Sequence, residues 1–314
     1  MDDAAAKPES PRVRVAVCMC TYRRPDVLRR LLNRIVEIAA DAADLAEVGV
    51  VVVDDDTDAS AKATTAEFEN VFALGVAYEN TASGNISVAR NRALERGIEM
   101  ADWLALIDDD CTAGPDWLRQ LLAVQSAFDA ECVSGHCIDV PPDGAPAWLT
   151  AEPFLDEFDA GDDGAVIVIG PLKNTLIAAD FLRRTGLRFD PAMGRIGGED
   201  ASFFYAANAA GLRHRYADVA VVREEVPADR ATLRYQLRRR YWYGNTEAVT
   251  SIASGRYSRP RILVSGLKRT AAAVARPVTQ LARRRRPQVR YALAETLRGL
   301  GRILGALGLR VKHH

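Results

Sequence analysis

The sequence predicts an α/β fold in which helices flank a mostly parallel sheet. Apolar runs rich in β-branched residues alternate with segments whose apolar residues recur at helical spacing. Repeated β-α-β units of this kind produce a parallel sheet that is covered by helices. Two aspartate clusters directly follow such runs, and folds of this class bind ligands beyond the carboxyl ends of their strands. We therefore expect a site at that edge of the sheet.

The first elements alternate strand and helix. Residues 13–20 are a short apolar run that the turn TYRRP breaks. A helix is predicted next, and its apolar face carries Val27, Leu28, Leu31, Leu32, Ile35 and Ile38. Residues 48–53 are a second strand, which ends at Asp54, Asp55 and Asp56. Residues 76–78 are a short third strand, and residues 86–100 are a helix.

The middle of the chain continues the pattern less regularly. A helix is predicted from about Trp117, and a strand over residues 131–140. Residues 141–164 form a loop-rich insertion with Trp148, Phe154 and Phe158, which either stack on sugar rings or cover the edge of the core. Residues 166–174 are predicted to resume as strand and turn.

The stretch WLALIDDDC, residues 103–111, delivers Asp108, Asp109 and Asp110 to the end of an apolar strand. Adjacent carboxylates repel one another, and a hard divalent cation bound through oxygen relieves that repulsion. A solvated acidic turn that caps the following helix explains the same residues equally well. These residues alone leave both interpretations open.

A second informative stretch is GGED, residues 197–200. The two glycines allow a close backbone approach, and Glu199 and Asp200 open a helix that Gly211 stops. Asp200 is suited to cap this helix, and it is also suited to accept a proton from an incoming hydroxyl. The two roles are compatible.

Charge is divided unevenly between the body and the end of the chain. From Arg256 onward, 15 Lys and Arg accompany one acidic residue, Glu295, which leaves 26 basic and 41 acidic residues before it. The tail also has an apolar stripe at helical spacing, formed by Leu293, Leu297, Leu300, Leu304, Leu307 and Val311. Basic amphipathic helices of this kind bind anionic membranes, and the run RRRR at 283–286 suits membrane or nucleic acid electrostatically.

The same features indicate domains and location. We expect a disordered N-terminus at 1–11, one catalytic or binding domain at 12–255 and a basic amphipathic tail at 256–314. Five cysteines without paired spacing, the absence of a signal peptide and the lack of an apolar stretch of about 18 residues indicate a cytoplasmic protein. The tail would hold it peripherally on the inner face of the cell membrane.

Glycine-rich phosphate loops are missing. No GxGxxG follows the first strand, no GxxxxGK[ST] occurs, and no GGxGxR stands at the first turn to hold a triphosphate. A nucleotide bound here must be held by side chains and a metal.

Several motifs in register carry a family resemblance. VAVCMCTYRRP, VVVDDD, GNISVARNRAL, LIDDD and GGED, in this order, resemble family 2 glycosyltransferases with the Rossmann-like GT-A fold, and the succinoglycan-type bacterial sugar transferases most of all. The resemblance covers residues 12–245. It implies a cofactor, Mg²⁺ or Mn²⁺, and a nucleotide-sugar donor, with a UDP-sugar favoured.

The resemblance also implies residue roles. Asp200 is the catalytic base and Glu199 lies near the acceptor, while Asp108 and Asp110 bind the metal. Residues expected around the donor are Thr21, Tyr22, Arg23, Asp54, Asp56, Arg90, Asn91, Asp108 and Asp109.

These roles imply an inverting transfer. One base opposite one metal-bound leaving group gives a single displacement. The amphipathic tail suggests a lipid-linked saccharide as acceptor, one sugar being added per encounter. A non-catalytic protein that uses the tail to bind membrane or nucleic acid is the alternative, although no nucleic acid is expected as partner.

Two positions depart from the family pattern. Arg223, Glu224 and Glu225 stand where many relatives place a histidine, which leaves a third metal contact open. Arg240 follows Arg239 where processive members have tryptophan. Arg239, Arg240 and Trp242 are either diphosphate or acceptor contacts, or part of a basic amphipathic helix packed on the sheet.

Overall fold

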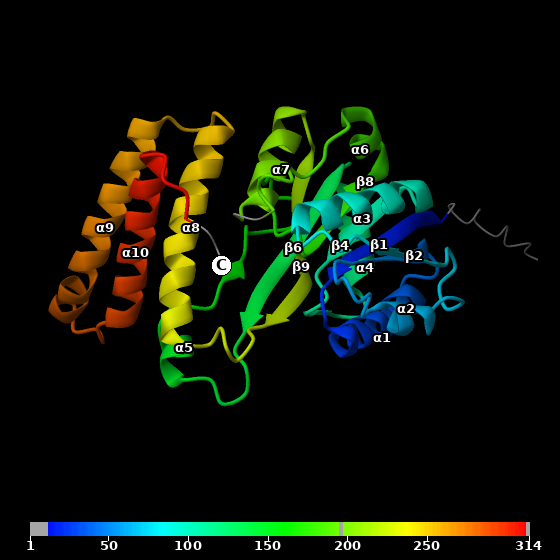
Figure 1. Cartoon of the computed structure of the whole chain (residues 1–314), viewed down its shortest axis with the longest axis horizontal. Helices are drawn as coiled ribbons and strands as arrows, with labels where there is room; N and C mark the ends of the chain where they lie inside the picture. Colours follow the sequence, from blue (N-terminus) through cyan, green and yellow to red (C-terminus); the bar gives the residue numbers. More distant parts are fainter. Residues whose placement is uncertain (1–11, 195–196, 312–314) are drawn as a thin grey trace, which may run out of the picture.

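The computed structural model describes residues 12–194 and 197–311 of the chain. The predicted disordered segment 1–11 lies outside these residues. Within them, one sheet of nine strands has the order β3-β2-β1-β4-β8-β6-β9-β5, with β7 paired to β6 (Figure 1). The strands of its first half are β1 Val13–Thr21, β2 Ala46–Asp54, β3 Val76–Asn80 and β4 Trp103–Ile107. These four strands run parallel, as predicted.

Helices cover both faces of this parallel half. Val15 and Val17 of β1 pack in the core cluster that holds the buried residues of α1 and α4, whereas Ala16 and Cys18 pack in the cluster of α3, α6 and α7. Successive side chains of a strand point to opposite faces, so β1 is buried on both sides. The helices are α1 Pro25–Asp41, α2 Lys62–Ala66, α3 Ile86–Met100, α4 Trp117–Ala127, α6 Ala179–Thr185 and α7 Glu199–Ala209.

The second half of the sheet is mixed. Its strands are β5 Cys111–Ala113, β6 Cys132–Val140, β7 Glu157–Phe158, β8 Asn174–Ala178 and β9 His214–Glu225. β8 lies antiparallel between β4 and β6, while β6 and β9 are parallel. Of the strand and turn predicted over 166–174, the turn is present at residues 172–173 but the strand part is wrong. The strand starts only at Asn174, after Gly170 and Pro171, and Val166 makes just an isolated bridge. Proline lacks the N–H that a central strand must donate.

The chain ends in a bundle of three helices beside the sheet (Figure 1). They are α8 Leu233–Ala253, α9 Arg259–Ala282 and α10 Val289–Ala306, while the short α5 Ala147–Ala151 lies in the insertion. α10 packs on both α8 and α9, so the bundle crosses the domain boundary predicted at 255/256. The buried amide of Asn245 in α8 donates to the carbonyl of Leu309 at 2.8 Å and accepts from the N–H of Val311 at 3.0 Å. Residues 309 and 311 are thereby tied to α8.

Small residues, not leucines, form the inner contact of α10. Gly301 and Gly305 face the backbone of α8, and Gly299 faces Gly266 and Thr270 of α9. Leu293 and Leu300 of the predicted stripe are exposed instead. Glycines without Cβ atoms let helix backbones approach closely, so they, rather than the bulky apolar residues, determine which side of α10 is buried.

This close contact predicts a large effect of adding side-chain volume. In Gly301→Val, the new Cβ meets the carbonyl of Tyr241, and we expect a loss of about 3 kcal/mol in the free energy of unfolding because backbone atoms cannot move aside cheaply. Urea unfolding followed by circular dichroism measures this loss. Ala275→Val on the exposed side of α9 is the matched control, with an expected loss of about 0.5 kcal/mol from helix propensity. Equal losses in the two variants would contradict close packing at Gly301.

Candidate functional site

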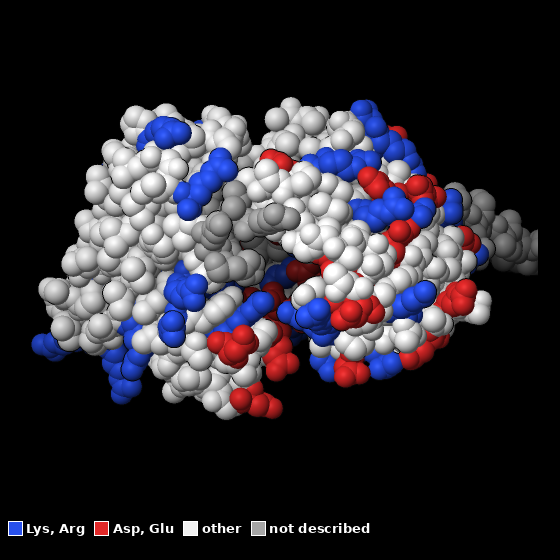
Figure 2. All heavy atoms as spheres, in the orientation of Figure 1, with Lys and Arg blue, Asp and Glu red and all other residues white. Residues whose placement is uncertain are grey.

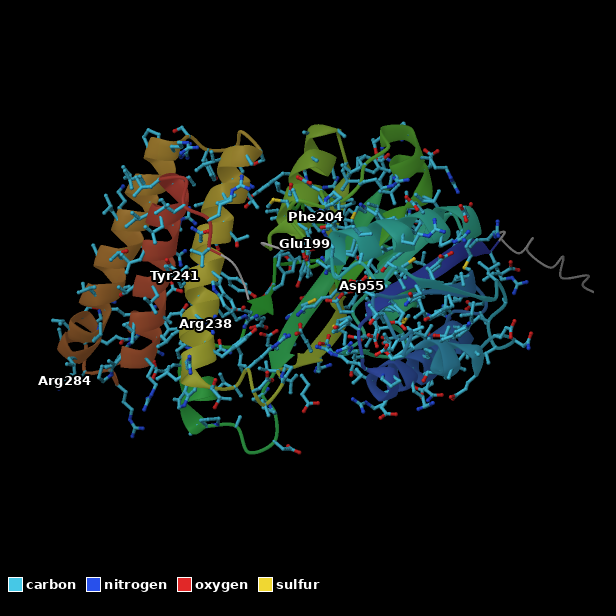
Figure 3. All side chains as sticks on the ribbon, in the orientation of Figure 1. Asp55, Glu199, Phe204, Arg238, Tyr241 and Arg284 are labelled. Carbon is cyan, nitrogen blue, oxygen red and sulfur yellow. The ribbon has the colours of Figure 1, made fainter. Side chains whose placement is uncertain are left out.

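The carboxyl ends of β1, β2 and β4 meet at one edge of the sheet, as parallel pairing requires. This places Thr21, Asp54 and the cluster 108–110 side by side. Across from them lie the start of α7, the end of β9 and helix α8. Figure 3 shows Glu199 at the start of α7, on the side of the sheet that faces the bundle, and Figure 2 shows charged atoms of both signs gathered in the hollow between the two parts.

Arg90 of α3 connects the two acidic motifs. Its Nη1 donates to Glu199 at 2.8 Å and pairs with Asp200, and its Nη2 lies 3.8 Å from Asp108. The Arg90 side chain is only 13% exposed, so this pairing takes place in a region with little water. The structure therefore brings Asp108, Glu199 and Asp200 together around one guanidinium, although 90 or more residues separate the two motifs.

Burial changes the proton affinity of these carboxylates. It raises the pKa of Asp200 to about 6, while the positive charges of Arg90 and Lys173 oppose the rise. The pKa of Asp108 is likewise raised to about 6 by burial, again opposed by Arg90. The Asp200 side chain keeps 39% of its surface exposed, despite the dense protein around it, and borders a cavity. Asp200 therefore titrates close to neutral pH and is accessible to a ligand.

Asp109 and Asp110 point to different partners. Asp109 is buried and accepts a hydrogen bond from the Thr21 hydroxyl at 2.7 Å, and burial raises its pKa to about 6. Asp110 lies 2.8 Å from Nη1 of Arg24, which also lies 3.2 Å from Asp109. Asp109 thus fixes the turn after β1 through Thr21. Sequence analysis missed Arg24, for which the second arginine of TYRRP was the available signal.

Two cavities adjoin the cluster. Asp109 and Asp110 line one of about 500 Å³ together with Arg24, Arg30 and Glu225. Asp108 and Asp200 line another of about 340 Å³, whose further walls are Pro171, Leu172, Lys173, Glu224, Arg230, Tyr235, Arg239, Trp242 and Tyr243. Of these two cavities, Asp110 lines the first and Asp200 the second, and Asp108, close to Asp110 in the chain, lines the second. Asp108 and Glu224 line the second cavity, and the residues next to them in the chain, Asp109 and Glu225, line the first.

The donor atoms suit a hard cation that is shared with a ligand. Asp108 and Asp110 offer carboxylate oxygens, which Mg²⁺ and Mn²⁺ prefer. Within residues 12–194 and 197–311, no group of three or more His, Cys, Asp or Glu side chains is arranged to hold a metal alone. Mg²⁺ is usually bound by one or two carboxylates plus substrate phosphates. The residues fit such a shared ion and do not form a complete protein cage.

The cluster after β2 has a structural role. Asp54 is fully buried and accepts from the N–H groups of Asp56 and Ala61 and from the Tyr78 hydroxyl at 3.0 Å. Asp56, also buried, accepts from Arg23 at 2.9 Å. Both carboxylates are thus engaged within the protein. Contacts of Asp54 and Asp56 with a nucleotide stay predictions.

The other residues expected around the donor divide into two groups. Tyr22 is exposed, and the guanidinium of Arg23 lies over its ring at 5.1 Å. Their place at the rim of the donor site stays a prediction. Asn91 instead donates to the carbonyl of Phe189 at 2.9 Å and accepts from its N–H at 2.8 Å. Its amide therefore holds the segment before α7 and is not directed at a ligand.

The wall opposite the sheet is basic and aromatic. Lys173 pairs with Glu224 and lies 3.6 Å from Asp139. Glu224, one of the three residues 223–225 in the stretch where the family pattern led us to expect a histidine, therefore already has a cationic partner. Sequence analysis missed Lys173. Arg239 lies 3.0 Å from Asp156 of the insertion.

Arg240 is a structural residue. It is buried, pairs with Asp156 at 2.9 Å and donates to the carbonyls of Pro153 and Phe154. Phe154 is itself buried between the rings of Trp148 and Tyr291. These two insertion aromatics therefore cover a core, which was one of the two interpretations open for them.

The sequence of this chain matches a family model and a known relative. The family model described as "Glycosyl transferase family 2" matches residues 16–214. The succinoglycan biosynthesis protein ExoM of Rhizobium meliloti (strain 1021) is 31% identical over 302 residues, which is 94% of each chain.

Solved structures share the fold at low identity. The mannosyltransferase PcManGT of Pyrobaculum calidifontis, in complex with GDP-Man and Mn²⁺, superposes with a TM-score of 0.57 at 18% identity, over 96% of this chain and 75% of that one. S. aureus TarS 1-349 in complex with UDP gives a TM-score of 0.55 at 14% identity, over 94% and 92% of the two chains. These likenesses show that the mixed sheet with its flanking helices is of the GT-A type. With a matching family model over most of its length and a similar relative over nearly all of it, the chain is a glycosyltransferase and belongs to family 2.

Proposed function

We propose that this glycosyltransferase is metal-dependent and inverting, and that it moves a sugar from a nucleoside diphosphate donor to a hydroxyl of a saccharide acceptor. The observation that carries this proposal is that the largely buried Arg90 joins Asp108 and Asp200 in one charge network. A carboxylate with raised pKa and an adjacent cluster of oxygen ligands are what such a transfer requires. Family membership favours this enzyme over a non-catalytic binding protein.

Each side chain has a task in this scheme. The carboxylate of Asp200 accepts the proton of the acceptor hydroxyl as that oxygen attacks the anomeric carbon. Arg90 keeps Asp200 oriented and opposes its protonation through its charge. Asp108 and Asp110 would hold Mg²⁺ or Mn²⁺, which stabilises the charge of the departing diphosphate. A single displacement of this kind inverts the anomeric configuration.

Related structures support a nucleotide-sugar donor. PcManGT was solved with GDP-Man and TarS with UDP-GlcNAc, so both uridine and guanosine donors deserve testing, with UDP-sugars first. Thermal shift with a panel of nucleotide sugars and Mn²⁺ identifies the donor, and slow donor hydrolysis then shows cleavage without an acceptor. No shift and no hydrolysis with any UDP- or GDP-sugar would contradict the proposal.

The raised pKa of Asp200 predicts a pH dependence. Below a pKa of about 6 the carboxyl is protonated and cannot accept a proton, so kcat/KM should rise from pH 5 to pH 7 and then level off. Arg90→Met removes a positive charge that lowers this pKa, so the rising limb should move to higher pH. Initial rates from pH 4.5 to pH 8.5 measure the rising limb for the wild type and for Arg90→Met. A wild-type limb centred near 4, as for an exposed aspartate, would exclude Asp200 as the group observed.

The helical bundle is suited to a membrane surface. We define the apolar platform as the exposed side chains Val264, Leu267, Val274, Val278 and Leu281 of α9 together with Val289, Leu293, Leu300, Leu307 and Leu309 in and around α10. Figure 2 shows few charged atoms over this part of the molecule, while Arg284 lies at its end in Figure 3. A helix pair with an apolar face and neighbouring arginines 283–286 fits the headgroup region of an anionic bilayer. A lipid-linked acceptor would be reached there.

Two features of the tail matter for a membrane test. Arg298 and Arg302 both pair with Glu247 of α8, so their charges are engaged within the bundle. Deleting the tail would also uncover the face of α8 that α10 buries, so point variants test membrane binding more cleanly. No helix among the described residues is both long and apolar enough to cross a membrane.

Removing part of the platform should weaken membrane binding. We expect serine at Leu267, Val274, Val278 and Leu281 together to lower affinity for vesicles of phosphatidylglycerol and phosphatidylcholine by about tenfold or more, because apolar burial drives interfacial binding. Cosedimentation measures the affinity. The control carries serine at four exposed apolar residues of the body, Leu45, Val71, Val166 and Val219. Equal binding by both variants would place the membrane contact elsewhere.

A further inference from the structure

Arg24 stands between the first strand and the first helix, directly beside the acidic cluster. Its Nη1 lies 2.8 Å from Oδ2 of Asp110 and 3.2 Å from Oδ1 of Asp109. The residue is at the N-cap position of α1, where an arginine side chain, which has only donors, cannot accept a capping hydrogen bond. Arg24 also lines the cavity of about 500 Å³ next to Asp110. Its side chain therefore contacts the two carboxylates and borders the cavity.

The position of Arg24 conflicts with a metal on the same carboxylate. A divalent cation at Asp110 and a guanidinium 2.8 Å from its Oδ2 would repel each other strongly in this partly buried region. Without any cation, Asp109 and Asp110 would repel each other in turn. Arg24 and a divalent cation would therefore compete for Asp110.

Only one of the two arginines at the cluster has room to move. Arg90 is 13% exposed and is bound on three sides by Asp108, Glu199 and Asp200. Arg24 is 37% exposed and borders open space. A guanidinium released there is well shaped to pair with phosphate oxygens through two parallel N–H groups.

We propose that Arg24 is a positioning residue that occupies Asp109 and Asp110 before the donor arrives and turns to the donor diphosphate when a divalent cation replaces it on Asp110. This inference rests on the proposed metal-dependent function and assigns Arg24 a task within it. It accounts for how three adjacent aspartates remain stable in the free enzyme. It also couples metal binding to the capture of the diphosphate.

The inference predicts effects of opposite sign in one variant. Arg24→Ala removes the competing cation, so the affinity for Mn²⁺ alone should increase about fivefold. The same variant lacks a phosphate partner, so the affinity for UDP or GDP at saturating Mn²⁺ should fall about tenfold. Electron paramagnetic resonance of free Mn²⁺ measures the first and calorimetry the second. A merely structural role for Arg24 would weaken both.

Two further variants sharpen the test. Arg24→Lys keeps the charge and loses the planar fork, so Mn²⁺ affinity should stay near that of the wild type while nucleotide affinity falls. Arg30→Ala removes a positive charge from the same cavity without touching Asp109 or Asp110, and both affinities should change less than about twofold. An Arg30→Ala variant that behaves like Arg24→Ala would reduce the effect to general electrostatics and overturn the inference.

The outcomes separate the inference from the function on which it rests. If the wild type binds neither UDP nor GDP with Mn²⁺, the proposed function fails and the role of Arg24 fails with it. If the wild type binds the nucleotide and Arg24→Ala binds Mn²⁺ equally or more weakly, only the inference fails. Tighter Mn²⁺ binding with weaker nucleotide binding establishes it.

Discussion

Asp200→Asn is expected to lower the rate of sugar transfer about a thousandfold, with donor affinity within about twofold of the wild type. Asparagine has nearly the same shape but cannot accept the proton of the incoming hydroxyl. Donor binding should persist because the cluster at 108–110 and the turn at Thr21 are unchanged. Transfer assays with the identified donor, together with calorimetry for donor affinity, measure the two effects separately.

Glu199→Gln is the matched control for this variant. Glu199 is the neighbouring carboxylate and pairs with the same guanidinium, that of Arg90. Each substitution therefore removes one negatively charged partner of Arg90. If only the pairing with Arg90 mattered, the two variants would lose similar activity. We expect a loss of about tenfold for Glu199→Gln. Full transfer activity in Asp200→Asn would remove Asp200 as the base.

The parallel half of the fold was predictable because its signals are local. Helix 86–100 was predicted with the bounds observed, since its apolar spacing ends where the next strand begins. The first two strands were predicted within two residues at each end. For the helix and for both strands, the residues buried at the sheet follow a regular apolar pattern that can be read from the sequence.

The bundle was less predictable because α10 buries its glycines and exposes several of its leucines, the reverse of the usual amphipathic helix. The leucine stripe of residues 293–311 was expected to be the functional face, and its exposed members do form part of the apolar platform. Sequence reasoning did not foresee that Gly299, Gly301 and Gly305 would bury the other side of α10. Close approach of glycines across helices depends on partners 29 to 60 residues away, and local periodicity contains no information about them.

The site shows the same division between local and distant information. The acidic motifs were identified from their own residues, and in the structure Asp108 and Asp200 line one cavity, while their roles stay predictions. Arg24 and Lys173 were missed because their partners lie 86 and 51 residues away in the chain. Asp54, expected to contact a base, holds a turn through backbone N–H groups. Which aspartate faces a cavity depends on tertiary packing, although all six share one sequence pattern.

Asp110→Ala is expected to weaken donor binding in the presence of Mn²⁺ about a hundredfold, which corresponds to roughly 2.7 kcal/mol. The variant loses a carboxylate that is placed at a cavity and suited to hold a cation against a diphosphate. Asp116→Ala is the control, because Asp116 is exposed, lies beyond β5 at the start of α4 and carries the same charge. Calorimetric titration with and without Mn²⁺ measures the effect, and unchanged Mn²⁺-dependent affinity in Asp110→Ala would contradict the metal assignment.

Combining Asp110→Ala with Arg24→Ala tests whether both residues act at one ion. If Arg24 competes with the metal for Asp110, the gain in Mn²⁺ affinity that Arg24→Ala produces should disappear once Asp110 is gone. The two substitutions would then be strongly non-additive, as expected for residues in direct contact. If the gain persists in the double variant, Arg24 acts on Mn²⁺ through the general field of the cavity, and the cation does not bind at Asp110.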